Sequence, residues 1–135
     1  MLKLADALGY TYQRADLVVL EGYSFGSKGR ALFDIAELGG IIRMTLLDHE
    51  YPYVEVPPSS LKKFATGKGN APKDLMLVEA VKRLGYTGSD HNEADALFLW
   101  HLAANAYGLP GAVTVPKSHM ETKARPAWPQ IAKVA

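Results

Sequence analysis

Two short apolar segments separated by a long helical stretch limit the fold of this chain more than any other feature. Residues 16–21 (DLVVLE) are apolar and rich in β-branched side chains, which predicts a buried strand. Residues 51–56 (YPYVEV) predict a second strand, closed by Pro57-Pro58. Between them, from about residue 30 to 49, apolar side chains recur with helical spacing. A strand–helix–strand unit with so long a connection predicts a parallel crossover and an α/β fold.

The second half of the sequence predicts helices joined by a basic loop. After the prolines, SSLKKFATGKGNAP predicts a short helical turn and then a glycine-rich loop. Residues 73–84 have the amphipathic pattern of a helix that ends at Gly85, and a further helix is predicted over about 92–107. Asp90 and Glu93, three residues apart at its start, predict a capping box.

Composition limits both the architecture and the chemistry. The chain has 135 residues, 48% apolar and 21% charged, as expected of one globular domain. It has no cysteine, which excludes disulfides, thiolate metal sites and thiol nucleophiles. No apolar run approaches the roughly 20 residues that cross a membrane, and no secretory leader is predicted, so we expect a cytoplasmic protein. One domain is expected over residues 1–108, followed by an extended, basic, proline-containing tail over 109–135.

Glu21 is the first candidate functional residue. Alternate residues of a strand share a face, so Glu21 is the polar end of a stripe with Leu17 and Val19. It stands at the carboxyl end of a predicted parallel strand, where α/β sheets place their ligands. The alternative is a strand-end carboxylate that reaches solvent or caps the next loop, and position alone does not separate the two.

Asp95 is the second candidate. It lies one turn into an alanine-rich helix, between Ala94 and Ala96, whose small side chains let a helix approach a sheet closely. His91 and Asn92 share its face. A carboxylate on the packed side of a helix is costly unless it is paired or bound to a metal ion. The alternative is that Asp95 faces solvent or pairs with a lysine.

A basic, glycine-containing segment is the third feature. The whole chain is nearly neutral, with 15 Lys and Arg against 14 Asp and Glu. Between Glu55 and Asp74, however, there is no acid, and four lysines occur there: Lys62, Lys63, Lys68 and Lys73. Gly67 and Gly69 would let backbone amides approach an anion, which suits a phosphodiester backbone. A solvated basic loop without a ligand is the alternative.

Convergence of Glu21 and Asp95 would require a cation between them. Two carboxylates about 4 Å apart repel by about 4 kcal/mol at an effective dielectric of 20. Oxygen ligands without cysteine favour Mg²⁺ or Mn²⁺. A magnesium–carboxylate cluster beside a lysine-rich loop is an arrangement used to hydrolyse phosphodiesters with metal-activated water.

Three segments in this order resemble RuvC-like Holliday junction resolvases of the phage and actinobacterial type, within the RNase H-like nuclease superfamily. They are DLVVLEGYSFGSKGRALFDIAELGG, YVEVPPSSLKKFATGKGNAPKD and DHNEADALFLW, and they cover about two thirds of the chain. The resemblance implies an RNase H-like fold in residues 1–108. It also implies a magnesium- or manganese-dependent endodeoxyribonuclease that resolves four-way or branched DNA in recombination and repair. Such an enzyme would be cytoplasmic, bacterial or phage-encoded, and a homodimer, because a symmetric junction needs two symmetric nicks.

The same resemblance implies roles for individual residues. Glu21 in VVLEGY and Asp95 in EADAL match metal-binding acids, and Asn92 falls where relatives have Asp or His and can offer a carbonyl ligand. Lys62 and Lys73 match lysines that contact the scissile phosphate region, so they join Glu21 and Asp95 as predicted catalytic residues. Predicted DNA contacts are Tyr23, Phe25, Lys28, Lys63 and Lys68, the two aromatic residues being candidates for a wedge against junction bases.

One departure from the family pattern keeps the enzyme assignment open. The family's first strand, in an opening β-meander, carries a metal-bridging aspartate in a pattern like GIDPG, which this chain lacks; Asp6 and Asp16 do not lie in such a motif. The strand over 16–21 is therefore predicted to have an open apolar edge. We expect a fragment, a misassigned start or a protomer whose edge another chain covers. The chain is then either a nuclease or a catalytically incomplete remnant that binds DNA or a partner protein.

The long helix predicted over about 30–49 has two further interpretations. Its Gly39-Gly40 pair weakens or bends a helix, or admits close packing. The apolar residues around the pair predict either a dimer face or core packing against the sheet.

GYSFGSKGR offers a third reading of the chain, as an unrelated phosphate-binding module. It follows a strand and opens a helix, as a P-loop does. Its glycines and lysine are wrongly spaced for that motif, however, and no Ser or Thr follows the lysine, so this reading has the least support.

Overall fold

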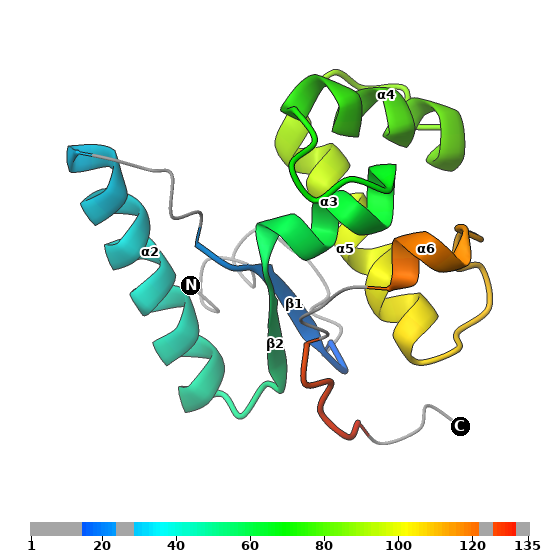
Figure 1. Ribbon diagram of the computed structural model, residues 1–135. Helices are drawn as coiled ribbons and strands as arrows, with labels where there is room; N and C mark the ends of the chain where they lie inside the picture. The colour runs from blue at the N-terminus through cyan, green and yellow to red at the C-terminus, as the bar shows by residue number, and fades with distance from the viewer. Residues whose placement is uncertain (1–14, 24–28, 122–125, 132–135) are drawn as a thin grey trace.

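Two parallel strands with a helical crossover form the centre of the computed structural model (Figure 1). The structure describes residues 15–23, 29–121 and 126–131. Strand β1 (Val18–Glu21) pairs with β2 (Tyr53–Val56), and Glu21 lies opposite Val56. Helix α2 (Arg30–Asp48) joins the two strands. The predicted α/β class and the parallel strand–helix–strand unit are therefore confirmed.

Four further helices follow β2 along the chain: α3 (Pro58–Thr66), α4 (Lys73–Leu84), α5 (His91–Ala106) and α6 (Lys117–Met120). Helix α4 ends at Gly85, whose φ of 66° is in the left-handed region that glycine adopts without strain. Helix α5 begins after Asp90, whose carboxylate accepts hydrogen bonds from the amides of Asn92 and Glu93. None of the helices in the described part of the chain is both long enough and apolar enough to cross a membrane.

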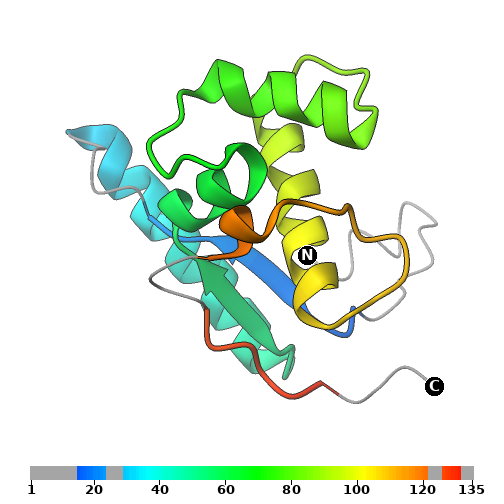
Figure 2. The same cartoon turned by 45° about the vertical axis from the view of Figure 1, so that its right-hand side comes forward.

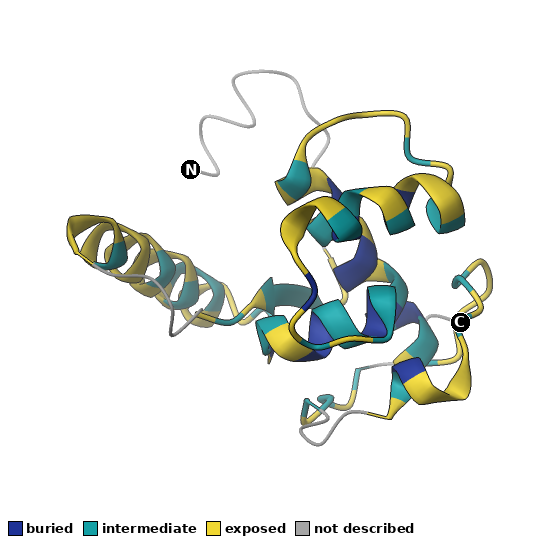
Figure 3. Cartoon of the chain, turned by 45° about the horizontal axis from the view of Figure 1, so that its top comes forward, coloured by how far each residue is buried: buried dark blue, intermediate teal, exposed yellow. Residues whose placement is uncertain are grey.

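Helix α2 and the other helices lie on opposite sides of the strand pair (Figures 1 and 2). The buried core forms where α3, α4 and α5 meet β2, and Phe64 and Phe98 contact edge to face there with ring centroids 6.3 Å apart. Figure 3 shows the buried positions gathered in these elements and none in α2. The core residues are Val56, Leu61, Phe64, Ala65, Met76, Ala80, Ala94, Phe98, Leu99 and Leu102.

Strand β1 is less buried than its sequence predicts. Val18, Val19 and Leu20 are half-buried, and Glu21 is exposed. Helix α5 packs on β1, whereas α2 on the other side has no buried residue, so one face of the strand stays incompletely covered.

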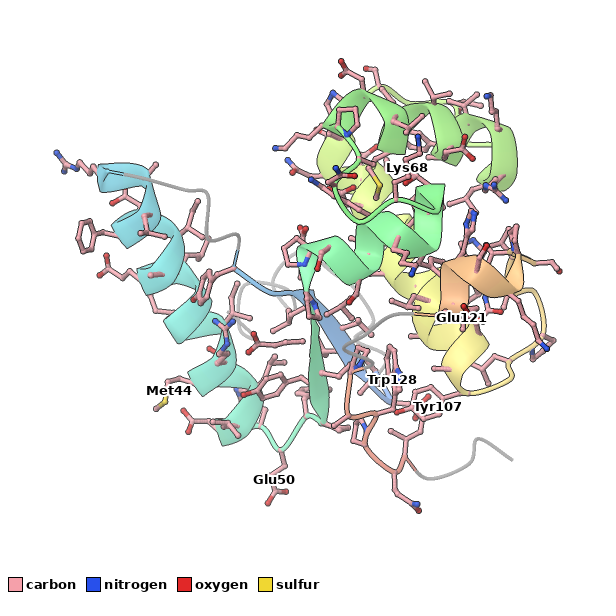
Figure 4. The ribbon with its side chains drawn as sticks, in the orientation of Figure 1. Met44, Glu50, Lys68, Tyr107, Glu121 and Trp128 are labelled. Carbon is pink, nitrogen blue, oxygen red and sulfur yellow. The ribbon has the colours of Figure 1, made fainter. Side chains whose placement is uncertain are left out.

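The C-terminal segment also differs from the predicted extended tail over 109–135. It includes α6, and Val113 and Trp128 pack against the core. The Trp128 ring meets Tyr107 nearly edge-on at 5.8 Å, and the Tyr107 hydroxyl donates a hydrogen bond to the Pro129 carbonyl at 2.6 Å (Figure 4). The segment folds back because its apolar side chains gain more from burial than from exposure to water.

Candidate functional site

The carboxyl end of β1 places Glu21 at a fixed point of the sheet. The Gly22 amide donates a hydrogen bond to the Val56 carbonyl at 2.8 Å, so strand pairing continues one residue past Glu21. Two prolines end β2 and begin α3, which turns the chain at the same end of the sheet. Lys62, one turn into α3, thereby comes to the strand end that carries Glu21.

Helices α4 and α5 bring the other charged groups to this end. Ala94 is fully buried, so the backbone of α5 approaches its neighbours closely, and Asp95 is the next residue. Lys73 is the first residue of α4, and buried Met76, one turn later, anchors that end of the helix in the core.

These groups line one cavity of about 410 Å³. Its polar wall brings together the five residues predicted for catalysis or metal binding: Glu21, Lys62, Lys73, Asn92 and Asp95. Its opposite wall is apolar and comes from the inner face of α2, with Leu32, Ile35, Leu38 and Ile42. The fold thus joins residues from β1, α3, α4 and α5 that are up to 74 positions apart in the sequence, counting from Glu21 to Asp95.

The electrostatics of the cavity show that its two carboxylates repel each other. Desolvation and then the charge of Asp95 raise the pKa of Glu21, while Lys62 and Lys73 act in the opposite direction. Desolvation likewise raises the pKa of Asp95, against the charges of Lys73, His91 and Lys62. The two acids are therefore close enough to repel each other, and the lysines compensate only in part.

This donor set fits a divalent cation. Two carboxylates and the Asn92 carbonyl are hard oxygen ligands, and the repulsion between Glu21 and Asp95 is what a cation would relieve. Within the described ranges, no group of three or more His, Asp or Glu side chains is placed to hold a metal ion. The set therefore suits an ion that completes its shell with water and phosphate oxygens, as Mg²⁺ commonly does.

Tyr23, Arg43 and Glu55 form a clamp between α2 and the sheet, which we call the Tyr23 clamp. Arg43 donates one hydrogen bond to Glu55 Oε1 at 2.6 Å and another to the Tyr23 hydroxyl at 2.8 Å. The Tyr23 hydroxyl donates in turn to the Ala36 carbonyl at 3.2 Å, and the guanidinium lies 4.7 Å from the centre of the Tyr23 ring. Sequence reasoning missed Arg43 and Glu55, because 12 positions separate them and no local pattern links a helix to the next strand.

Three of the predicted DNA contacts, Tyr23, Lys63 and Lys68, lie in the described part of the chain. Lys68 is exposed in the loop between α3 and α4 (Figure 4), and Lys63 is half-buried on α3. Neither lines the cavity, whereas Tyr23 does. Phe25 and Lys28 lie outside the described residues.

Comparison with known proteins finds several similar sequences that carry one name. A protein from Anaeromyxobacter sp. (strain K), "Crossover junction endodeoxyribonuclease RuvC", is 30% identical over 122 residues, which cover 82% of this chain and 66% of that protein. Its namesake from Anaeromyxobacter dehalogenans (strain 2CP-1 / ATCC BAA-258) is 33% identical with the same coverage. The chain belongs to the RuvC-like family. No protein-family model matches it.

A solved structure supports the fold of this RuvC-like chain. The Thermus thermophilus RuvC structure superposes with a TM-score of 0.53 and 17% sequence identity, covering 84% of this chain and 66% of the other. This likeness confirms the predicted RNase H-like fold. The RuvC-like chain spans 66%, just under two thirds, of the length of the Anaeromyxobacter relatives described above.

Proposed function

We propose that this RuvC-like chain is a metal-dependent endonuclease that cuts four-way or branched DNA. The observation that carries the proposal is the convergence of Glu21 and Asp95 with Lys62 and Lys73 around one cavity at the carboxyl end of β1. The relatives' name, which specifies crossover junctions, supports this choice of DNA structure. The loop that carries Lys68 leads directly into α4, whose first residue, Lys73, lines the cavity.

The two lysines and the two acids divide the work at a phosphodiester. Lys62 and Lys73 already act on both carboxylates through space, so their charges reach the volume in which a phosphate would sit. They would hold the phosphate and offset the negative charge that develops on it. Tyr23, Lys63 and Lys68 would contact the backbone further from the scissile bond.

The acids serve as ligands in this proposal. Glu21 and Asp95, with the Asn92 carbonyl, would hold Mg²⁺ or Mn²⁺. When bound, such an ion would polarise the phosphate and make water a stronger nucleophile. Both acids must be ionised to bind a cation, and the neighbouring lysines favour that form.

A second candidate function is a catalytically incomplete protein that binds branched DNA without cutting it. In the described part of the chain, two acids line the cavity, and this low number favours the second function. In both functions the lysines bind branched DNA, and the difference is whether the phosphodiester is cut.

A second copy of this chain would bind on the outer side of helix α2. This side carries an exposed stripe of apolar and small residues that lie three or four positions apart and so share one face: Phe33, Ala36, Gly40, Met44 and Leu47. Ala36 and Gly40 are small, and a side chain added at Gly40 would meet nothing within 4 Å, so another helix could come close. A homodimer on this stripe would give the two-fold symmetry that paired nicks in a four-way junction require.

A cleavage assay on a labelled four-way junction, with Mg²⁺ or Mn²⁺, tests the proposal. We expect symmetric nicks from the wild type and a loss of at least about a hundredfold in Glu21→Gln and Asp95→Asn. Asp34→Asn, which removes an exposed acid of α2 that lies outside the cavity and off the stripe, is the control and should keep full activity. Tight junction binding without any nick would select the second candidate function, and neither binding nor cutting would refute both.

A further inference from the structure

His119 stands out because it is buried and outside the candidate site. It lies on α6, and only 9% of its surface is exposed. Its Nδ1 is 3.0 Å from the Phe64 carbonyl oxygen, across 55 positions of sequence. A carbonyl oxygen only accepts hydrogen bonds, so Nδ1 must carry the proton and donate. His119 thereby satisfies one of the carbonyls left open at the end of α3.

The other side of the His119 ring lies against the turn that ends α3. Gly67, the residue after that helix, has a φ of 82°, and its amide donates to the Lys63 carbonyl at 2.9 Å. A Cβ placed on Gly67 would lie 2.8 Å from His119 Nε2, so the ring fills the space that a side chain would take. One imidazole therefore contacts both the last turn of α3 and the first residue of the loop.

This turn starts the basic loop of residues 67–72, and the ends of the loop lead to the cavity. Thr66 stabilises its beginning, because the hydroxyl accepts from the Lys68 amide at 3.1 Å and lies 2.9 Å from the Lys62 carbonyl. Lys62 precedes the loop and Lys73 follows it, and both line the cavity. Lys68 lies exposed between them (Figure 4). A shift in the Gly67 turn would therefore move Lys68 relative to both cavity lysines.

We infer that His119 is a positioning residue that holds the Lys68 loop in the shape in which it meets DNA phosphates. The inference rests on the proposed function and extends it, since it makes the C-terminal segment a part of the phosphate-binding apparatus. His119 does not touch the DNA. It acts through the Phe64 carbonyl and the Gly67 turn, so that the loop is already ordered before DNA arrives.

A DNA-free experiment tests the bracing itself. Trypsin cuts after an exposed lysine when the loop around it opens, so the rate of cleavage at Lys68 measures loop order. His119→Phe keeps a ring but loses the donor, and we expect cleavage faster by up to about fivefold, the factor for one lost hydrogen bond. His119→Asn can place a donor where Nδ1 stands and should stay within about twofold of the wild type.

Tyr107→Phe is the matched control for general loosening of the C-terminal segment. It also removes one hydrogen bond of that segment, to the Pro129 carbonyl, but lies away from the loop. We expect no change at Lys68 in this variant. Equal acceleration in Tyr107→Phe and His119→Phe, or none in His119→Phe, would overturn the inference.

Binding to a labelled four-way junction in EDTA, measured by fluorescence anisotropy, tests the consequence for DNA. Apparent affinity falls with the fraction of molecules in which the loop is ordered, so His119→Phe should bind more weakly. One lost hydrogen bond multiplies the ratio of open to ordered loop by about five, so the increase in cleavage and the loss of affinity should multiply to about five. Because His119 contacts no phosphate, the slope of log K against log salt should not change. Lys68→Gln removes a phosphate contact and should reduce that slope by about 1.

The outcomes separate the inference from the proposed function. If Lys68→Gln weakens binding and His119→Phe changes neither binding nor cleavage at Lys68, the inference fails and the proposed function stands. If His119→Phe changes the salt slope by about 1, His119 is itself a phosphate contact and the positioning role is wrong. If the wild type does not bind DNA at all, the proposed function fails, and faster cleavage at Lys68 would then support loop bracing alone.

Discussion

Glu21 illustrates, at the scale of a single residue, how the placement of an acid in the candidate site lowers the stability of the fold. Its folded-state pKa is raised above 4.5 by desolvation and by Asp95, so folding disfavours its charged form. A carboxyl with a raised folded pKa contributes stability below its unfolded pKa and loses it as pH rises through the folded pKa. Glu21→Gln should therefore be more stable than the wild type at pH 7 in EDTA, with no difference well below pH 4.5.

Urea unfolding at the two pH values measures this difference. Asp34→Asn is again the control and should match the wild type, since that acid lies outside the cavity. A Glu21→Gln variant less stable than the wild type at pH 7 would mean that Glu21 has a stabilising partner instead of a repelling one.

Gly39 and Gly40 are neighbours on α2 with opposite constraints. A Cβ on Gly39 would overlap the Tyr23 hydroxyl and lie 2.7 Å from Arg43 Nη1, whereas one on Gly40 would meet nothing within 4 Å. Alanine in a helix interior is favoured over glycine by about 1 kcal/mol. In the monomer, Gly40→Ala should therefore stabilise by up to about 1 kcal/mol, and Gly39→Ala should destabilise by about 1–3 kcal/mol through overpacking.

Urea denaturation at low protein concentration compares the two variants without interference from dimers. Equal effects of the two alanines would show that Tyr23 does not rest on Gly39. The sequence predicts that this pair either weakens the helix or admits close packing, and the structure assigns close packing to Gly39 alone.

At the scale of elements, the Tyr23 clamp joins α2 to β2 through side chains, and the strength of this link depends on pH. The hydrogen bond from Arg43 lowers the pKa of Glu55 below 4.5. A lowered folded pKa means that the contribution of Glu55 is present above 4.5 and disappears as pH falls through the folded pKa. An NMR titration of the Glu55 carboxyl should show the lowered midpoint, and Arg43→Gln should return it toward 4.5.

High salt is the control for this prediction. The pair is partly exposed, so added salt should screen it and move the Glu55 midpoint upward in the wild type, with a smaller effect in Arg43→Gln. A midpoint that is the same in both proteins would show that Arg43 and Glu55 do not interact in solution.

The sequence predicts the elements well because each has a local cause. The helix over 73–84 has an amphipathic period and a glycine stop, and the structure reproduces both bounds. Each of the two strands begins two residues later than predicted, at the residue where strand pairing begins. Asp90 caps α5 as predicted. Glu93 does not complete the capping box, because its carboxylate accepts a hydrogen bond from the Tyr86 hydroxyl instead. That partner lies seven positions away, beyond the reach of a capping pattern.

Contacts between distant segments could not be predicted in the same way. Motifs predict the candidate site residue by residue, and the fold shows that six of those residues share a cavity. The Tyr23 clamp and the contact of His119 with α3 have no sequence signature, because each joins side chains whose neighbours in sequence carry no common pattern. Their discovery needed the spatial arrangement of α2, α3 and α6.

At the scale of the whole molecule, Trp128 ties the C-terminal segment to the core. It is half-buried and packs against Tyr107, so Trp128→Ala should destabilise the chain by about 2 kcal/mol, below the range for a fully buried tryptophan. Trp100→Ala is the matched control: that side chain is 53% exposed, and its loss should cost less than about 0.5 kcal/mol. Urea unfolding distinguishes the two, and equal losses would show that Trp128 does not pack on the core in solution.

In the proposed homodimer, the exposed stripe of α2 forms the interface between the two copies. Met44 lies on the stripe and points away from the sheet (Figure 4), so in a dimer Met44→Lys would bury an unpaired charge at the seam. We expect sedimentation to shift from a dimer to a monomer in this variant, and nicks in a four-way junction to become unpaired. Thr45→Lys adds the same charge off the stripe and should leave the dimer intact. Because dimerisation depends on concentration, the comparison needs one concentration for all proteins. A wild type that stays monomeric at high concentration would rule out this partner, whereas dissociation by both lysines would place the interface elsewhere.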